Sequence, residues 1–288
     1  MTVIYKKELR RLLGGFLAYA AIAVLLLAYG FYTSYGNLFL AYTDITNTLV
    51  GSFYALLIAL PAVTCGLYAY EYRSRGTGLW YSLGFTPTQI VMGKLLAALT
   101  VVGFALGFLA LIPVFISFFG EVDRALCYFS WLGYVLLTVA LTSLCAFLSA
   151  FWKRAWVAFL VSVGALVLLW LLNFILTALP VAAWFSFVIV ELLLLGVGAW
   201  LYFVVGSRRA AIVSGILPVL VAVLFILKSQ AFVALIPRVL AKINPISRFS
   251  GFLFSSFDLG GIVYLISFAV FFTVLTVLVL RDRRENEF

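Results

Sequence analysis

Long apolar runs separated by short polar segments make up this sequence from end to end. A helix needs about 20 apolar residues to cross roughly 30 Å of hydrocarbon, and runs of that size recur along the chain. The pattern predicts an all-α, polytopic helical membrane protein that forms a single transmembrane domain over residues 1–288. The expected spans lie near residues 16–35, 49–70, 95–119, 127–151, 155–176, 184–205, 210–227 and 261–280.

The basic residues between the apolar runs predict the orientation, because Lys and Arg are enriched in cytoplasmic segments. With the N-terminus inside, 14 of the 19 Lys and Arg residues fall in inner segments and 5 in outer ones. Both termini are therefore expected to be cytoplasmic. The weakest span, 210–227, contains Pro218. If it did not cross, the basic residues of 281–284 would lie outside, so eight spans are favoured over the alternative of six.

Composition supports this class and removes several functions. Hydrophobic residues make up 66% of the chain and charged residues 10%, which a soluble domain of this length would not tolerate. The net charge of +9 sits in short clusters between apolar runs, so no nucleic-acid binding is expected. The three cysteines (Cys65, Cys127 and Cys145) have no CxxC spacing and are predicted to be small core residues.

Catalytic motifs are missing from the sequence. There is no histidine, which excludes Ser–His nucleophilic catalysis and HExxH zinc sites. The stretch from Gly84 to Lys94 has glycines too far apart for a phosphate loop, and Leu95 stands where Ser or Thr is needed. The chain is therefore not expected to be an enzyme or to hold a cofactor or metal itself.

The N-terminal segment 1–14 has the pattern of an amphipathic helix lying on the inner leaflet. The alternative is a basic anchor for the first span. Its expected apolar face is Tyr5, Leu9, Leu12, Leu13 and Phe16, and its expected polar face is Lys6, Lys7, Glu8, Arg10 and Arg11.

Residues 71–94 form the longest polar interruption in the first half of the chain, and we expect a helix–break–helix elbow at the cytoplasmic surface. Thr86 can cap a helix, Pro87 suits its first position, and Gln89 stands where a capping box requires it. The segment could be a docking surface for a cytoplasmic partner. It could equally be an ordinary loop anchored in the headgroups by Trp80 and Tyr81.

The outer segment 228–260 predicts a membrane-hugging cap or a partly re-entrant hairpin. A helix with an apolar face from Phe232 to Ile243 carries Arg238 and Lys242 on its other side, and Asn244-Pro245 should end it. Pro237 is expected to strain this helix. Phe249, Phe252, Phe254 and Phe257 follow.

Two polar residues fall deep inside predicted spans. Glu191 is acidic, and an ionisable group there marks either a transport pathway or a protonated carboxyl bonded to a neighbouring helix. Asn173 is a possible pathway residue too, although interhelical hydrogen bonding explains it more simply.

Three stretches together resemble the permease subunits of ABC-2 type ATP-binding-cassette transporters, in the group of gliding-motility and nitrous-oxide-reductase-maturation permeases. The first is YKKELRRLLGGFLAY near the N-terminus, and the last runs from NPISRF through the final span to RDRR. The middle one is EYRSRGTGLWYSLGFTPTQIVMGKLLAA, an E-x-R-x-x-G-T pattern leading through T-P to G-K. The residues that match there are Glu71, Arg73, Gly76, Thr77, Pro87, Gly93 and Lys94.

The resemblance implies a multi-pass permease of a bacterial cell membrane that exports or flips a substrate. A second permease subunit, in a homodimer or heterodimer, and separate cytoplasmic ATPase subunits that bind ATP and Mg would complete the transporter. Such permeases commonly have six spans, so residues 184–227 are predicted to be an added hairpin. The expected ATPase-coupling residues are Glu71, Arg73, Arg75, Gly76, Thr77, Thr86, Pro87, Gln89 and Lys94.

Two other functions remain open at this point. An ion-coupled secondary transporter would use Glu191, and a membrane anchor or assembly factor would transport nothing. The sequence does not distinguish among lipid, peptide, drug and glycan substrates, because the spans are uniformly apolar.

Overall fold

A computed structural model describes residues 2–14, 32, 35, 45–74, 80–118, 123–205, 218, 220–253 and 258–287. Its regular structure within those residues is entirely helical, which confirms the predicted class. It divides into two compact units, Met1–Trp170 with Pro245–Phe288 (unit 1) and Leu171–Asn244 (unit 2), described separately below. The helices are α1 (Thr2–Leu13), α3 (Thr46–Thr64), α4 (Gly66–Ser74), α6 (Pro87–Leu109), α7 (Ile112–Ile116), α8 (Arg124–Phe151), α9 (Ala155–Ala178), α10 (Ala183–Val205), η1 (Ser229–Phe232), α12 (Leu235–Ile243), α13 (Pro245–Leu253) and α14 (Leu259–Glu287).

Five segments of the described chain are long and apolar enough to cross a membrane, so length and hydropathy identify a multi-pass membrane protein. They confirm five predicted spans, and the bounds of α10 match those of the predicted span 184–205. Span 16–35, apart from residues 32 and 35, and half of 210–227 lie outside the described residues, so the choice between eight and six spans stays a prediction. The five segments are Thr46–Tyr72, Pro87–Ile116, Arg124–Phe151, Ala155–Leu176 and Leu259–Arg283.

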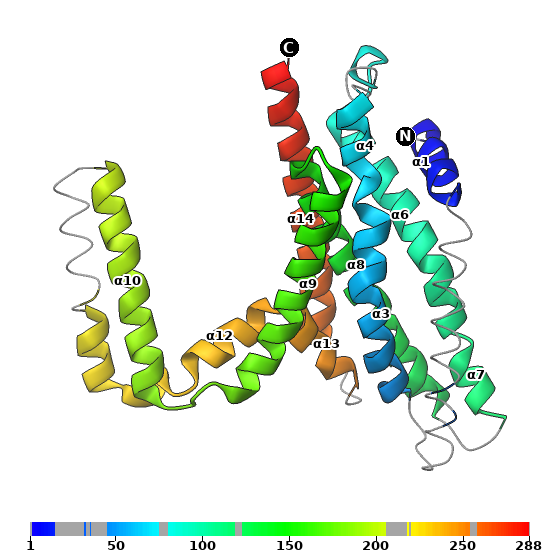
Figure 1. Cartoon of the computed structure of the whole chain (residues 1–288). Helices are drawn as coiled ribbons and strands as arrows, with labels where there is room; N and C mark the ends of the chain where they lie inside the picture. The colour runs from blue at the N-terminus through cyan, green and yellow to red at the C-terminus, as the bar shows by residue number, and fades with distance from the viewer. Residues whose placement is uncertain are drawn as a thin grey trace. The chain divides into compact units, whose positions relative to one another are not determined.

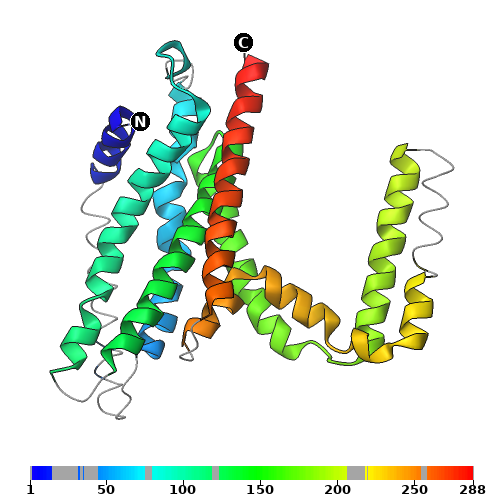
Figure 2. The ribbon, with the colours of Figure 1, turned by 180° about the vertical axis from the view of Figure 1, so that it is seen from behind.

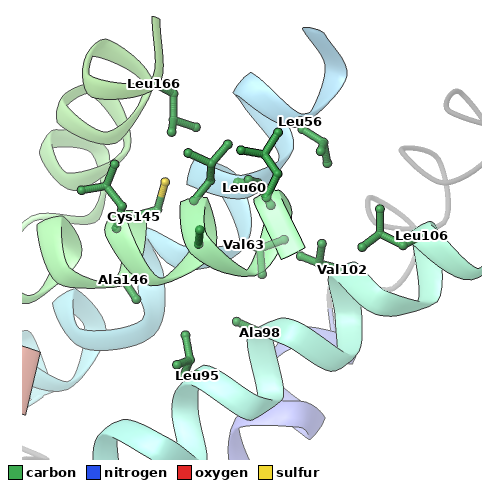
Figure 3. Packing of buried hydrophobic residues seen from close by; sticks show 14 of the residues in the cluster. Leu56, Leu60, Val63, Leu95, Ala98, Val102, Leu106, Cys145, Ala146 and Leu166 are labelled. Carbon is green, nitrogen blue, oxygen red and sulfur yellow. The ribbon is translucent and has the colours of Figure 1, made fainter. Parts of the chain in front are cut away.

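Helix α8 is central to unit 1 and packs against α3, α4, α6, α13 and α14 (Figures 1 and 2). Side chains of α3, α6, α8 and α9 converge in its core, including Leu60, Val102, Cys145 and Leu166 (Figure 3). Cys145 is fully buried there, Cys127 is also buried, and all three cysteines are free thiols, as the sequence predicts.

One end of unit 1 gathers the ends of several helices. Tyr72 donates a hydrogen bond to the carbonyl of Ala150 (3.1 Å), and Tyr81 donates one to the carbonyl of Leu280 (3.3 Å). Arg283 donates to the carbonyl of Phe151 (2.6 Å) and lies over the Tyr72 ring at 4.4 Å. Helix α1 and the C-terminal end of α14 lie at this same end (Figures 1 and 2).

We call this the basic end, because the described cations of predicted inner segments belong to it. They are Lys6, Lys7, Arg10, Arg11, Lys94, Lys153, Arg154, Arg281 and Arg283. Their common location agrees with the orientation predicted from the charge distribution.

The opposite end of unit 1 is fastened by α13. The Ser130 hydroxyl donates to the carbonyl of Phe252 at 2.9 Å, and both Phe249 and Phe252 are buried. Phe252 fits against Gly133 of α8 and Gly261 of α14, where a Cβ would lie 2.5 Å and 2.9 Å from its ring atoms. The two outer-segment phenylalanines are thus core residues that connect three helices.

Unit 2 contains α10, η1 and α12 together with helical residues 220–227. Phe187 of α10 stacks on Phe225, with ring centroids 4.4 Å apart, and Phe232 packs edge-on against both. Helix α12 ends before Asn244, as predicted, and Arg238 and Lys242 are exposed on it.

The expectation that Pro237 strains α12 is wrong. The helix begins at Leu235, so Pro237 lies in its first turn. A backbone N–H there would have no partner within the helix, and its absence in proline therefore costs no intrahelical hydrogen bond.

Replacing Gly133 with alanine should destabilise unit 1, because the new methyl group would overlap the Phe252 ring. We expect a loss of about 1–3 kcal/mol in unfolding free energy, which is typical of overpacking. Thermal unfolding of the purified protein in detergent measures this as a lowered Tm. Gly103→Ala on α6 is the matched control, because a Cβ there meets nothing within 4 Å. An equal effect of both substitutions would contradict the proposed close packing.

Candidate functional site

The start of α6 shows the predicted capping box. The Thr86 hydroxyl accepts a hydrogen bond from the backbone N–H of Gln89 (3.4 Å). In return, the side-chain oxygen of Gln89 accepts one from the backbone N–H of Thr86 (3.2 Å). Pro87 occupies the first helical position. The box fixes where the helix begins, and Lys94 follows two turns later on its buried side.

Lys94 is fully buried and is held by three acceptors. Its ammonium lies 2.7 Å from Glu71 Oε2 and 3.3 Å from Glu8 Oε1, and it donates to the carbonyl of Leu67. An ammonium has three N–H donors, so every one has an acceptor within reach. We call Lys94, its two carboxylates and the side chains that contact those carboxylates (Lys7, Arg11 and Trp80) the Lys94 cluster.

Glu71 links α4 to the segment that precedes α6. Its Oε1 accepts a hydrogen bond from the indole N–H of Trp80 at 2.9 Å, and Lys7 of α1 lies 3.6 Å from the same oxygen. The Lys7 ammonium also lies 4.2 Å from the centre of the Trp80 ring. Trp80 is only 4% exposed, so the prediction that its ring anchors the segment in the headgroups is wrong, while the choice between a loop and a docking surface stays open.

The position of Glu8 differs from the one predicted for it on the N-terminal helix. It was predicted on the polar face, yet it is fully buried between Ile4 and Leu12 on the stripe of α1 that packs against α6. The four-residue spacing of these three residues aligns them on one side of the helix. Arg11 lies 2.7 Å from the second Glu8 oxygen, so the buried carboxylate has a cation at each oxygen.

The rest of α1 agrees more closely with the prediction. Lys6, Lys7 and Arg10 are exposed, and Arg11 is half-buried. Tyr5 and Leu9 are partly buried against the core, whereas Leu13 is exposed. Phe16 lies outside the described residues.

The cluster joins elements that are far apart in the sequence. Glu8, Glu71 and Lys94 come from α1, α4 and α6, so the ion pairs fix how these helices meet at the basic end. Burying an ion pair costs desolvation, and its net contribution to stability is small. Losing one partner is different, because a buried charge is then left uncompensated. The cluster therefore specifies one mutual position of the three helices.

The other predicted elbow residues divide into two groups. Glu71 and Lys94 are buried, so any coupling role must be indirect, through the helices they connect. Arg73 lies in α4, but the structure does not describe its side chain. Arg75, Gly76 and Thr77 lie outside the described residues, and so does the helix break predicted near Gly76.

The two predicted pathway residues lie in unit 2. Glu191 is partly buried, and its Oε1 atom has no hydrogen-bond partner within the described structure. It follows Phe187 by one helical turn on α10. Asn173 of α9 is partly buried.

Comparison with known proteins gives no match: no protein-family model, no curated protein and no solved structure is similar to this chain. The resemblance to ABC-2 permeases therefore rests on the sequence motifs alone. The described residues contain no group of three His, Cys, Asp or Glu side chains placed to hold a metal ion.

Replacing Lys94 with methionine should strongly destabilise the junction, because Glu8 and Glu71 would be left facing each other without the shared cation. Removing one partner from a buried pair costs about 3–5 kcal/mol, measurable as a large fall in Tm in detergent. The triple variant Glu8→Gln, Glu71→Gln, Lys94→Met should regain part of that loss, since no uncompensated carboxylate remains.

Lys6→Met is the control for this prediction, because it removes an exposed cation from the same end of the chain. Its effect should stay within about 0.5 kcal/mol. If Lys94→Met behaves like Lys6→Met, the buried cluster does not hold the helices as described.

Proposed function

We propose that this chain is the membrane-spanning permease subunit of an ATP-binding-cassette transporter of the ABC-2 type. It exports or flips a substrate, using the energy of separate cytoplasmic ATPase subunits, and pairs with a second permease subunit. The motif resemblance, the multi-pass apolar fold and the absence of a nucleotide motif in the sequence support this proposal.

The observation that carries the proposal is the Lys94 cluster. A permease driven from outside needs a firm connection between its cytoplasmic surface and its spans. Here a surface helix, α1, and the segment before α6 are tied by buried charges to the first turns of a spanning helix. A displacement applied to either would reach α6 directly, because a buried ion pair resists separation.

The exposed face of α1 and the polar sequence segment 73–79 are then the proposed places for ATPase contact. Lys6 and Arg10 project from α1, and Arg73 and Arg75 belong to the polar segment. Glu71 and Lys94 are buried, so they would transmit movement without touching the partner.

Affinity purification of the tagged chain from its native membrane tests this function. We expect a retained subunit that is labelled by an azido-ATP photoprobe, and an ATPase activity that depends on the tagged chain. Arg73→Glu with Arg75→Glu should reduce the retained subunit roughly tenfold, because opposite charges at a protein interface favour docking.

Arg124→Glu is the matched control, since it reverses an exposed cation at the other end of α8 and should leave retention unchanged. Under conditions in which the Lys94→Met variant remains folded, it should keep the ATPase bound but show reduced transport-linked ATP hydrolysis. Absence of any ATP-binding subunit, together with no effect of the Arg73 and Arg75 reversals, would overturn the proposal.

A second candidate, an ion-coupled secondary transporter, is favoured by one observation: Oε1 of Glu191 is buried and has no hydrogen-bond partner among the described residues. Such a carboxyl can bind and release a proton during transport. In this case transport into vesicles should persist without ATP, collapse with the proton gradient and be lost in Glu191→Gln. The first proposal expects the reverse: ATP dependence, and transport that survives Glu191→Gln.

A further inference from the structure

A short turn at the basic end combines exposed aromatic rings with free cations. Residues 152–154 connect α8 to α9, and Trp156 lies in the first turn of α9. Trp152 is 42% exposed and Trp156 is 60% exposed, while Lys153 and Arg154 between them are also exposed. We call Trp152, Lys153, Arg154 and Trp156 the 152–156 patch.

The two cations of this patch differ from most others at the basic end. Lys7, Arg11, Lys94, Arg281 and Arg283 all contact carboxylates, carbonyls or aromatic rings of the chain. Within the described residues, the side chains of Lys153 and Arg154 make no ion pair, hydrogen bond or ring contact. No contact among those residues therefore explains two adjacent positive charges here.

Helix electrostatics acts on these cations in two opposite directions. They follow the C-terminal end of α8 at Phe151, whose partial negative charge favours cations, although Arg283 already donates to the Phe151 carbonyl. The carbonyl of Arg154 accepts a hydrogen bond from the Ala158 amide at 3.1 Å, so both cations also stand at the start of α9, whose partial positive charge disfavours them. The two contributions oppose each other, and an external anion would stabilise both cations.

The position of the patch identifies the anion. The turn contains only three residues between two membrane-spanning segments, so its side chains stay close to the ends of those spans. Trp residues with one apolar and one polar edge collect at headgroup level. Cations at that depth meet lipid phosphates, whereas a cytoplasmic protein would dock farther from the bilayer.

We propose that the 152–156 patch binds the headgroup of an anionic phospholipid in the inner leaflet. Lys153 and Arg154 contact the phosphate, and the rings of Trp152 and Trp156 lie beside the glycerol and upper acyl region. The inference depends on the predicted orientation of the chain and not on the proposed transporter function.

Native mass spectrometry of the full-length chain tests the proposal, with equal amounts of phosphatidylglycerol and phosphatidylcholine added in detergent. Each Lys or Arg near an anionic surface contributes about 1 kcal/mol, so the wild type should prefer phosphatidylglycerol on the order of tenfold. The double variant Lys153→Gln, Arg154→Gln should bind the two lipids almost equally. Lys153→Arg with Arg154→Lys should retain the preference.

The matched control is Arg124→Gln with Lys242→Gln, which removes two exposed cations from predicted outer segments. It should keep the wild-type preference, and glycerol 3-phosphate at the same concentration should not compete. If the double variant is unstable, Lys153→Gln and Arg154→Gln alone should each remove part of the preference. The proposal would be overturned if the control variant lost the lipid preference equally, or if glycerol 3-phosphate competed with the lipid. It would also be overturned if the Lys153 and Arg154 double variant lost a bound protein but kept its lipid preference.

Discussion

A single buried ammonium group, that of Lys94, determines how the basic end of this protein is built. It has no access to water, so its three N–H groups must find acceptors within the chain. It finds one in the backbone of α4 and two in carboxylates from α4 and α1. One arrangement of α1, α4 and α6 is therefore favourable, and the apolar packing of their remaining side chains is compatible with it.

This constraint is different in kind from the packing in the membrane-spanning part of unit 1. Apolar side chains pack adaptably, since contacts such as those of Leu60 and Val102 can be replaced by others of similar size. Ion pairs that are buried and shared by three helices permit much less adjustment. The structure thus combines adaptable contacts along the spans with a restrictive connection at the basic end.

Much of this architecture is predictable from the sequence. Apolar run length predicts five of the observed membrane-spanning segments, and the Thr86-Pro87-Thr88-Gln89 stretch predicts the start of α6, because both signals are local. The burial of Glu8 is not local: it depends on Lys94 lying opposite, 86 positions later. The spacing Ile4, Glu8, Leu12 could have indicated it, but a charged residue in an otherwise basic segment suggests a solvent-facing position. The core role of Phe252 depends on a glycine in α8, which sequence periodicity does not reveal.

The contacts of α14 have a mechanical consequence. Near its start, Gly261 meets the Phe252 ring that also fills the space at Gly133 of α8. Near its other end, Arg283 reaches the last carbonyl of α8, and Leu280 accepts a hydrogen bond from Tyr81. Helices α8 and α14 are thus joined near both ends, with α13 fastened to them at one end, and should move as one rigid body. Helix α6 is linked to this body by Tyr81 and by the Trp131 indole, which donates to the Leu106 carbonyl at 3.1 Å, so a movement of α6 should carry the body with it.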